Sequence, residues 1–150
     1  MPVVSAGQPA PEFTLRTAKG EPFTRESLLG RTTVLVFYPF AFSPVCTDQL
    51  SVYNEVLDDF AERGATLYGV SCDATYSQSA FKDALGIEIE QLSDFEPKGA
   101  ACRAFGVYHP GGFPKRALVV VDPDGTVRWS FEAPSPEELP GANLIFDALS

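Results

Sequence analysis

The sequence predicts an α/β domain with a mixed central β-sheet and helices on both faces. Three short apolar runs, Thr33–Phe37, Ala65–Ser71 and Ala117–Val121, are bounded by turn residues and are typical of buried strands. Helical patterns lie between these runs, and the third run is followed by a turn and a further strand. The strands alternate with helices, and the last two strands form a hairpin. This order predicts a mixed sheet that helices cover on both faces.

The N-terminal part predicts a hairpin and then a long helix. Residues 13–16 and 21–23 flank Ala18-Lys19-Gly20, which favours a turn, so we expect an N-terminal β-hairpin. Residues 27–30 predict a short helical turn. After the first buried strand, residues 47–63 form an amphipathic stretch that ends at Gly64. Its apolar side chains recur at helical spacing: Leu50, Tyr53, Val56, Leu57 and Phe60.

The segment between this strand and this helix carries a reactive cysteine. Ser43 fits an N-cap and Pro44 fits the first helical position, which places Cys46 in the first turn. Backbone N–H groups there lack intrahelical acceptors, and the helix dipole favours negative charge, so the thiolate form of Cys46 is favoured. The Ser43 hydroxyl would lie near the sulfur, and Pro39 would shield it from water. The alternative, a small buried apolar side chain, fits fewer of these signals.

The second half of the chain continues the alternation. The expected elements are a helix over residues 78–85, a short strand over 90–93, a short helix over 98–105, a loop over 109–114, a turn over 122–125, a strand over 126–131 and a helix over 144–149.

Pro39, Ser43 and Cys46 together have the spacing Pro-x-x-x-Ser-x-x-Cys, which resembles the active-site motif of the peroxiredoxins. The sequence is most similar to the branch of alkyl hydroperoxide reductase E and the bacterioferritin comigratory proteins. The resemblance runs over nearly the whole chain and includes these segments: Gly7-Gln8-Pro9-Ala10-Pro11-Glu12-Phe13, Gly69-Val70-Ser71, Leu92-Ser93-Asp94, Gly106-Val107-Tyr108 and Arg116 before Val119-Val120-Val121-Asp122.

This resemblance implies a thioredoxin-like fold and a thiol-dependent peroxidase. Such an enzyme reduces hydrogen peroxide and organic hydroperoxides through a sulfenic acid on Cys46, with no cofactor and no metal. The resemblance also implies that Arg116 is the catalytic arginine, that the active-site face forms a homodimer, and that an external thiol returns the enzyme to its reduced form. Taken alone, Arg116 would be interpreted as a solvated charge at a strand end.

Two positions depart from the family pattern. Ser43 stands where threonine is commoner, so the hydroxyl remains but the methyl group that restricts its rotamer is lost. Gln49 stands where a glutamate often orients the arginine. An uncharged amide still accepts a hydrogen bond, but we expect it to hold Arg116 less rigidly.

Composition limits the other possibilities. The 150 residues fit one domain, residues 1–150, and the formal net charge of −9 argues against nucleic acid and anionic membranes as partners. The N-terminus has neither the basic region nor the apolar core of a signal peptide, and three cysteines do not make a disulfide framework, so we expect a cytoplasmic protein. We expect His109 at the surface, and no metal, because no cysteine and histidine cluster has ligand spacing.

The sequence leaves the recycling of Cys46 open. Position 51, where some relatives carry a resolving cysteine, is serine, so we favour a one-cysteine mechanism with a thioredoxin-like or glutaredoxin-like protein or a low-molecular-weight thiol as reductant. The alternative is an atypical two-cysteine mechanism that resolves through Cys102 or, less favoured, Cys72. A redox sensor that oxidises once at Cys46 is a further alternative. A dithiol oxidoreductase is disfavoured because Ser43 stands where a Cys-x-x-Cys pair needs its first cysteine.

Overall fold

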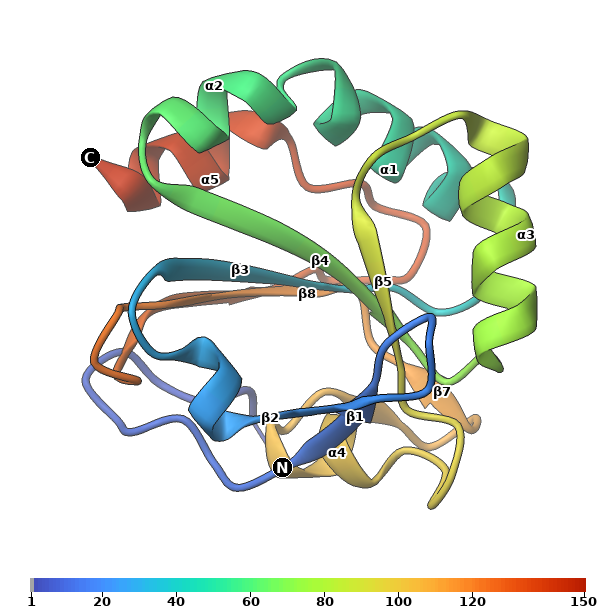
Figure 1. Cartoon of the computed structure of the whole chain (residues 1–150), viewed down its shortest axis with the longest axis horizontal. Coiled ribbons are helices and arrows are strands. Elements are labelled where there is room, and N and C mark those ends of the chain that lie inside the picture. Colours follow the sequence, from blue (N-terminus) through green and yellow to red (C-terminus); the bar gives the residue numbers. More distant parts are fainter. Residues whose placement is uncertain (1) are drawn as a thin grey trace.

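A seven-stranded mixed β-sheet divides the molecule into two apolar cores (Figure 1). The structure is a computed structural model and describes residues 2–150. Its strands are β1 (Thr14–Arg16), β2 (Pro22–Thr24), β3 (Thr32–Phe37), β4 (Ala65–Ser71), β5 (Glu90–Ser93), β6 (Tyr108–His109), β7 (Phe113–Pro114), β8 (Ala117–Val121) and β9 (Val127–Glu132). Its helices are the 3₁₀ turn η1 (Arg25–Leu28), α1 (Pro44–Glu55), α2 (Leu57–Glu62), α3 (Thr75–Leu85), α4 (Ala100–Ala104) and α5 (Ala142–Leu149).

Strand β3 lies near the middle of the sheet, whose order is β2-β1-β5-β4-β3-β8-β9. It pairs in parallel with β4 and antiparallel with β8, and all six of its residues are buried. A strand covered on both faces is expected to be apolar along its whole length, which explains its composition. Because Phe37 lies opposite Ala117 in β8, the residue before Ala117 lies beside the loop that leaves β3.

Successive side chains of β3 point into different cores, as the two-residue period of a strand requires. Val34 and Val36 pack with α1, α2, α3 and α5, which cover one face in Figure 1. Leu35 and Phe37 pack with the β1–β2 hairpin, η1 and α4 on the opposite face. The expected fold class, with its N-terminal hairpin, is confirmed.

Three local features differ from the sequence-based expectations. The long helix is interrupted at Val56, whose φ of −111° and ψ of 19° separate α1 from α2. The expected loop over residues 109–114 is a small hairpin of β6 and β7, with its turn at Pro110–Gly112. The short helix expected over residues 98–105 is confined to the five residues of α4.

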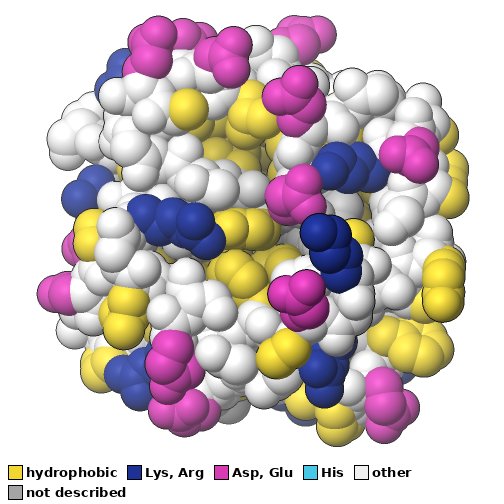
Figure 2. Space-filling view, in the orientation of Figure 1, with side chains coloured by type: hydrophobic (Ala, Val, Ile, Leu, Met, Phe, Trp, Pro, Cys, Tyr) yellow, Lys and Arg dark blue, Asp and Glu magenta, His cyan; other side chains and the backbone are white. Residues whose placement is uncertain are grey.

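The surface of the described residues has an acidic edge. Figure 2 shows acidic side chains along the edge that α1 and α2 form, where the first turn of α2 carries Asp58 and Asp59. Within residues 2–150, no helix has both the length and the apolar character to span a bilayer.

Candidate active site

Cys46 lies in the first turn of α1, where the sequence placed it. Ser43 is the N-cap, with extended backbone angles of −70° and 149°, and Pro44 begins the helix. The Ser43 side chain makes no capping hydrogen bond, so its hydroxyl is not used by the helix. The Cys46 side chain is fully buried beneath this turn.

The loop between β3 and α1 has a strained residue. Phe42 has a φ of +70°, which a bulky residue rarely adopts. Its ring packs on that of Phe81 from α3, with centroids 5.1 Å apart, although the residue is 56% exposed. One residue earlier, the N–H of Ala41 donates to Asp73 at 2.8 Å, so the end of β4 holds this loop in place.

Arg116 immediately precedes β8. Because β8 pairs with β3, Arg116 lies next to the buried sulfur of Cys46. Its Nη2 lies 3.2 Å from Sγ of Cys46, and only 2% of the residue is exposed. The alternative interpretation of Arg116 as a solvated strand-end charge is therefore wrong. A guanidinium at this distance can donate a hydrogen bond to the sulfur and places a positive charge beside it.

The other two guanidinium nitrogens of Arg116 also have acceptors. Nε donates to the Pro136 carbonyl at 2.8 Å, and Nη1 donates to Oε1 of Gln49 at 2.5 Å. Gln49 is fully buried and its amide donates to the hydroxyl of Tyr53 at 3.1 Å. Tyr53 in turn donates to the Pro140 carbonyl at 2.6 Å. Burial raises the pKa of Tyr53 to about 12, so this hydroxyl keeps its proton at neutral pH.

This chain of hydrogen bonds bears on the expectation that Gln49 holds Arg116 loosely. A neutral amide accepts from the guanidinium, as expected, but its own orientation is fixed by Tyr53. Each guanidinium nitrogen has its own acceptor, so the arginine is constrained from three directions. The expectation of a less rigidly held Arg116 is not supported by this geometry. Sequence reasoning did not identify Tyr53 as part of the site, because at helical spacing it had only the signature of a core residue.

A pocket of about 420 Å³ lies beside Arg116, the residue that contacts the buried sulfur. Its walls include Pro39, Phe40, Ser43, Phe113 and Arg116, so three of the four site residues predicted from the sequence meet here. Most of the wall is apolar, and its polar groups come from Ser43, Arg116 and Glu137. The pocket thus contains a fixed cation and an uncommitted hydroxyl in a mostly apolar wall, and the cation contacts the thiol buried next to it.

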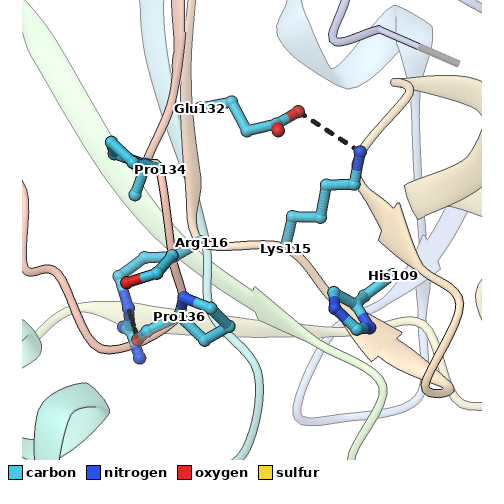
Figure 3. Close-up of a pocket in the computed structure, with 8 residues that line it drawn as sticks. His109, Lys115, Arg116, Glu132, Pro134 and Pro136 are labelled. Carbon is cyan, nitrogen blue, oxygen red and sulfur yellow. Dashed lines mark hydrogen bonds and ion pairs between the residues drawn. The ribbon is translucent and has the colours of Figure 1, made fainter.

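Arg116 also borders a second, smaller pocket of about 110 Å³ (Figure 3). Here Lys115 pairs with Glu132 at 3.4 Å, and His109 lies on the same side as Lys115, across from Arg116 and Pro136. His109 is partly buried, since its ring stacks on Phe113 with centroids 4.3 Å apart and Nδ1 accepts from the N–H of Gly111. The sequence predicts His109 at the surface, and the structure shows it only partly exposed.

The remaining cysteines, Cys72 and Cys102, lie in the other core. They pack beneath the opposite face of the sheet, among the residues that contact the β1–β2 hairpin and α4, whereas Cys46 packs with α1 and α3. All three thiols are free. The structure therefore places Cys46 and the two candidate resolving cysteines in different cores, so a disulfide with Cys46 would require movement of the chain.

A thioredoxin-like sheet with a first-turn thiol beside a buried arginine is the arrangement expected of a cysteine-dependent peroxidase, and comparisons with known proteins show that class. Residues 6–130 match the AhpC/TSA family. The chain belongs to this family of peroxiredoxins and is a thiol-dependent peroxidase. It is 30% identical to alkyl hydroperoxide reductase E of Mycobacterium tuberculosis over 150 residues, covering 99% of this chain and 97% of that protein.

Two further comparisons support the same assignment. A peroxiredoxin of Thermoplasma volcanium is 34% identical over 142 residues, covering 90% of this chain and 68% of the relative. The crystal structure of peroxidoxin BcpB from Mycobacterium tuberculosis superposes with a TM-score of 0.84 at 28% identity, covering 97% of this chain and 96% of that one. The resemblance inferred from the Pro39, Ser43 and Cys46 motif is confirmed.

Proposed function

We propose that Cys46 is the peroxidatic nucleophile and reduces hydrogen peroxide and organic hydroperoxides. Its thiolate attacks one peroxide oxygen, the O–O bond breaks, and the second oxygen leaves as water or an alcohol after it gains a proton. Cys46 becomes a sulfenic acid. The single observation that carries this proposal is the 3.2 Å contact between the Cys46 sulfur and the guanidinium of Arg116, a residue that also lines a pocket.

Each neighbouring group has a part in this step. Arg116 stabilises the thiolate and donates to the oxygens as charge moves onto the leaving group, in the manner of an oxyanion hole. The Ser43 hydroxyl, which does not cap the helix, is free to hold a peroxide oxygen. Pro39 lines the pocket and excludes water from the reacting atoms. The apolar wall of Phe40 and Phe113 suits the hydrocarbon part of an organic hydroperoxide.

For the reductive half of the cycle we favour a one-cysteine mechanism. Residue 51 is serine, and the two other thiols pack under the opposite face of the sheet from Cys46. An external thiol, either a low-molecular-weight compound or a thioredoxin-like or glutaredoxin-like protein, attacks the sulfenic acid and releases water. Resolution through Cys102 or Cys72 is the competing mechanism.

The proposal includes the cellular compartment of the enzyme. Three cysteines without a disulfide suit a reducing compartment, which supports a location in the cytoplasm.

Phe40 and Phe42, which are 48% and 56% exposed, give the active-site face an apolar surface that a second copy of the chain would cover. Sedimentation equilibrium of the reduced protein tests for the homodimer, and a monomer at all concentrations contradicts it.

The deciding experiment compares Cys46→Ser with Cys72→Ser and Cys102→Ser. Stopped-flow consumption of one equivalent of hydrogen peroxide should disappear in Cys46→Ser and persist in the other two variants. Without added thiol, the wild-type protein should carry a sulfenic acid on Cys46 that reacts with dimedone and is located by mass spectrometry. Peroxide consumption by Cys46→Ser at the wild-type rate refutes the assignment.

The same preparations separate the remaining alternatives. A Cys46–Cys102 or Cys46–Cys72 disulfide that forms quickly in dilute protein establishes the two-cysteine mechanism. Turnover beyond one equivalent of peroxide once a thiol is added distinguishes a peroxidase from a sensor, which stops after one oxidation.

A further inference from the structure

The two cysteines that the peroxidase site does not use lie next to each other. Sγ of Cys72, Sγ of Cys102 and a carboxylate oxygen of Asp94 are all within 4.8 Å of one another. Residues 72 and 102 are far apart in the sequence, so this cluster is a product of the fold.

Strand pairing and a helix start bring the cluster together. Ser71 of β4 pairs with Ser93 of β5, so the next residues, Cys72 and Asp94, leave the sheet side by side. The carboxylate of Asp94 then accepts from the N–H of Ala101 at 3.1 Å and from that of Cys102 at 2.8 Å. These bonds fix the start of α4, and with it the position of the second thiol.

The two thiols differ in their access to solvent. Cys72 is 8% exposed and lines a pocket of about 320 Å³ together with Pro39, Phe40, Phe95 and Lys98. Cys102 is fully buried behind it. A small reagent that enters this pocket therefore meets Cys72 first, and Cys102 only through Cys72.

The two thiols also differ in acidity. A hydrogen bond from Cys102 lowers the pKa of Cys72, and the positive charge of Lys98 acts in the same direction. The same hydrogen bond, together with burial and the nearby Asp94 carboxylate, raises the pKa of Cys102. The accessible thiol is thus the better nucleophile, and the buried one stays protonated until it is needed.

We propose that Cys72 and Cys102 form a second redox site, a dithiol that reduces low-molecular-weight disulfides by thiol–disulfide exchange. The Cys72 thiolate attacks one sulfur of the substrate, forms a mixed disulfide and releases one thiol. Cys102 then gives up its proton and attacks the Cys72 sulfur, which forms the Cys72–Cys102 disulfide and releases the second thiol. The dithiol supplies two electrons, and one substrate disulfide becomes two thiols. This site is independent of Cys46.

The test uses the full-length Cys46→Ser variant, in which the peroxidase thiol cannot contribute. Reduced protein is incubated with excess bis(2-hydroxyethyl) disulfide, quenched with acid, alkylated and digested with trypsin without reduction. Cleavage after lysine and arginine should leave residues 64–82 joined to residues 99–103 by a disulfide. Two molecules of 2-mercaptoethanol should appear per chain.

Variants of the pair test the order of the two steps. In the Cys46→Ser background, Cys102→Ala should stop at a mixed disulfide on Cys72 and release only one molecule of 2-mercaptoethanol. Cys72→Ala should react at least about tenfold more slowly, because the remaining thiol is buried. Circular dichroism confirms that each variant is folded.

Two outcomes overturn the proposal. One is a Cys46→Ser protein whose Cys72 stays unreacted, or carries a mixed disulfide that Cys102 never displaces. The other is one zinc ion per chain in native mass spectrometry, lost in Cys72→Ala, in protein that forms no Cys72–Cys102 disulfide. That result would make the cluster a metal site. Neither outcome depends on whether Cys46 reduces peroxide.

Discussion

Arg116 donates to Oε1 of Gln49, an acceptor 67 residues earlier in the chain. The bond ties the residue before β8 to the second turn of α1, which carries Cys46 one turn earlier. The guanidinium and the thiol are therefore positioned by the same helix, and a change at Gln49 reaches the sulfur through Arg116.

Arg116→Ala should slow the reaction with peroxide by roughly a hundredfold or more, since loss of an oxyanion-hole donor typically costs about 2.7–4 kcal/mol of barrier. Arg116→Lys should recover only part of the rate, because an ammonium lacks the planar fork that serves three acceptors. Stopped-flow single-turnover rates measure both. Arg128→Ala, which removes an exposed ion pair with Asp122, is the matched control and should leave the rate unchanged. Equal rates for wild type and Arg116→Ala contradict the assignment.

Gln49→Ala should lower the rate without removing any group that touches the peroxide. Gln49→Glu keeps an acceptor for Arg116 and should restore most of the rate, which a purely structural role would not predict. The comparison of the two variants in the same stopped-flow assay is the measurement. A wild-type rate in Gln49→Ala shows that Arg116 does not need this acceptor.

Tyr53→Phe tests the far end of the hydrogen-bond chain. The variant leaves the buried amide of Gln49 without its acceptor and the Pro140 carbonyl without its donor. We expect a loss of about 1–3 kcal/mol in the free energy of unfolding, typical of an unsatisfied buried polar group. Urea denaturation measures it, and an unchanged midpoint argues that the two groups find other partners.

Ser43→Ala should separate catalysis from stability. Replacing an N-cap serine usually costs about 1 kcal/mol, but this side chain makes no capping bond, so the free energy of unfolding should fall by less than about 0.5 kcal/mol. The peroxide rate should fall about tenfold or more, because a hydrogen bond to a charged group is worth about 1.5–3 kcal/mol. Ser43→Thr should retain the rate. A large loss of stability with an unchanged rate would assign Ser43 to the helix instead.

Asp94 should give the protein a distinctive dependence on pH. Burial raises the pKa of this carboxyl above its ordinary value of 3.8 despite the N–H bonds of α4, so the folded chain binds the proton more tightly than the unfolded chain. The stability from Asp94 is therefore present below that ordinary value and is lost as pH rises through its folded pKa. The difference in unfolding free energy between wild type and Asp94→Asn should shrink as pH rises across this window.

Asp124→Asn is the control of opposite sign. The pKa of exposed Asp124 is lowered by hydrogen bonds from Thr126, so its contribution is present above the ordinary value and is lost as pH falls. Urea titrations at several pH values from mildly acidic to neutral measure both differences. A difference for Asp94→Asn that grows with pH refutes the assignment.

Local signals in the sequence were sufficient to predict the start of α1. The order of Ser43 and Pro44 before an apolar helical pattern is encoded within a few residues, so the position of Cys46 followed from it. Arg116 is different, because nothing around it indicates burial. Only the pairing of β8 with β3 places it beside Cys46, and only the family resemblance assigned it to the site.

Features that depend on distant segments could not be predicted. The Cys72 and Cys102 cluster arises from the register of β4 with β5 and from a carboxylate that fixes α4. The β6–β7 hairpin has a composition of proline and glycine that favours a loop, and its two-residue strands are too short for an alternation pattern. The break at Val56 has no marker, since one β-branched residue is tolerated inside many helices.

Because Cys46 is completely buried, we expect the two halves of the proposed catalytic cycle to differ in how easily their reactants reach the sulfur. The size of the incoming molecule would decide this. On the proposed mechanism a hydroperoxide is small enough to pass between side chains to the sulfur, whereas a protein thiol would bring a bulky surface with it. We therefore expect reduction by a protein thiol to require opening of the first turn of α1, with a rate that scales with the fraction of open molecules. Agents that loosen this turn, such as mild urea, would speed recycling by a protein reductant while they slow the attack on peroxide.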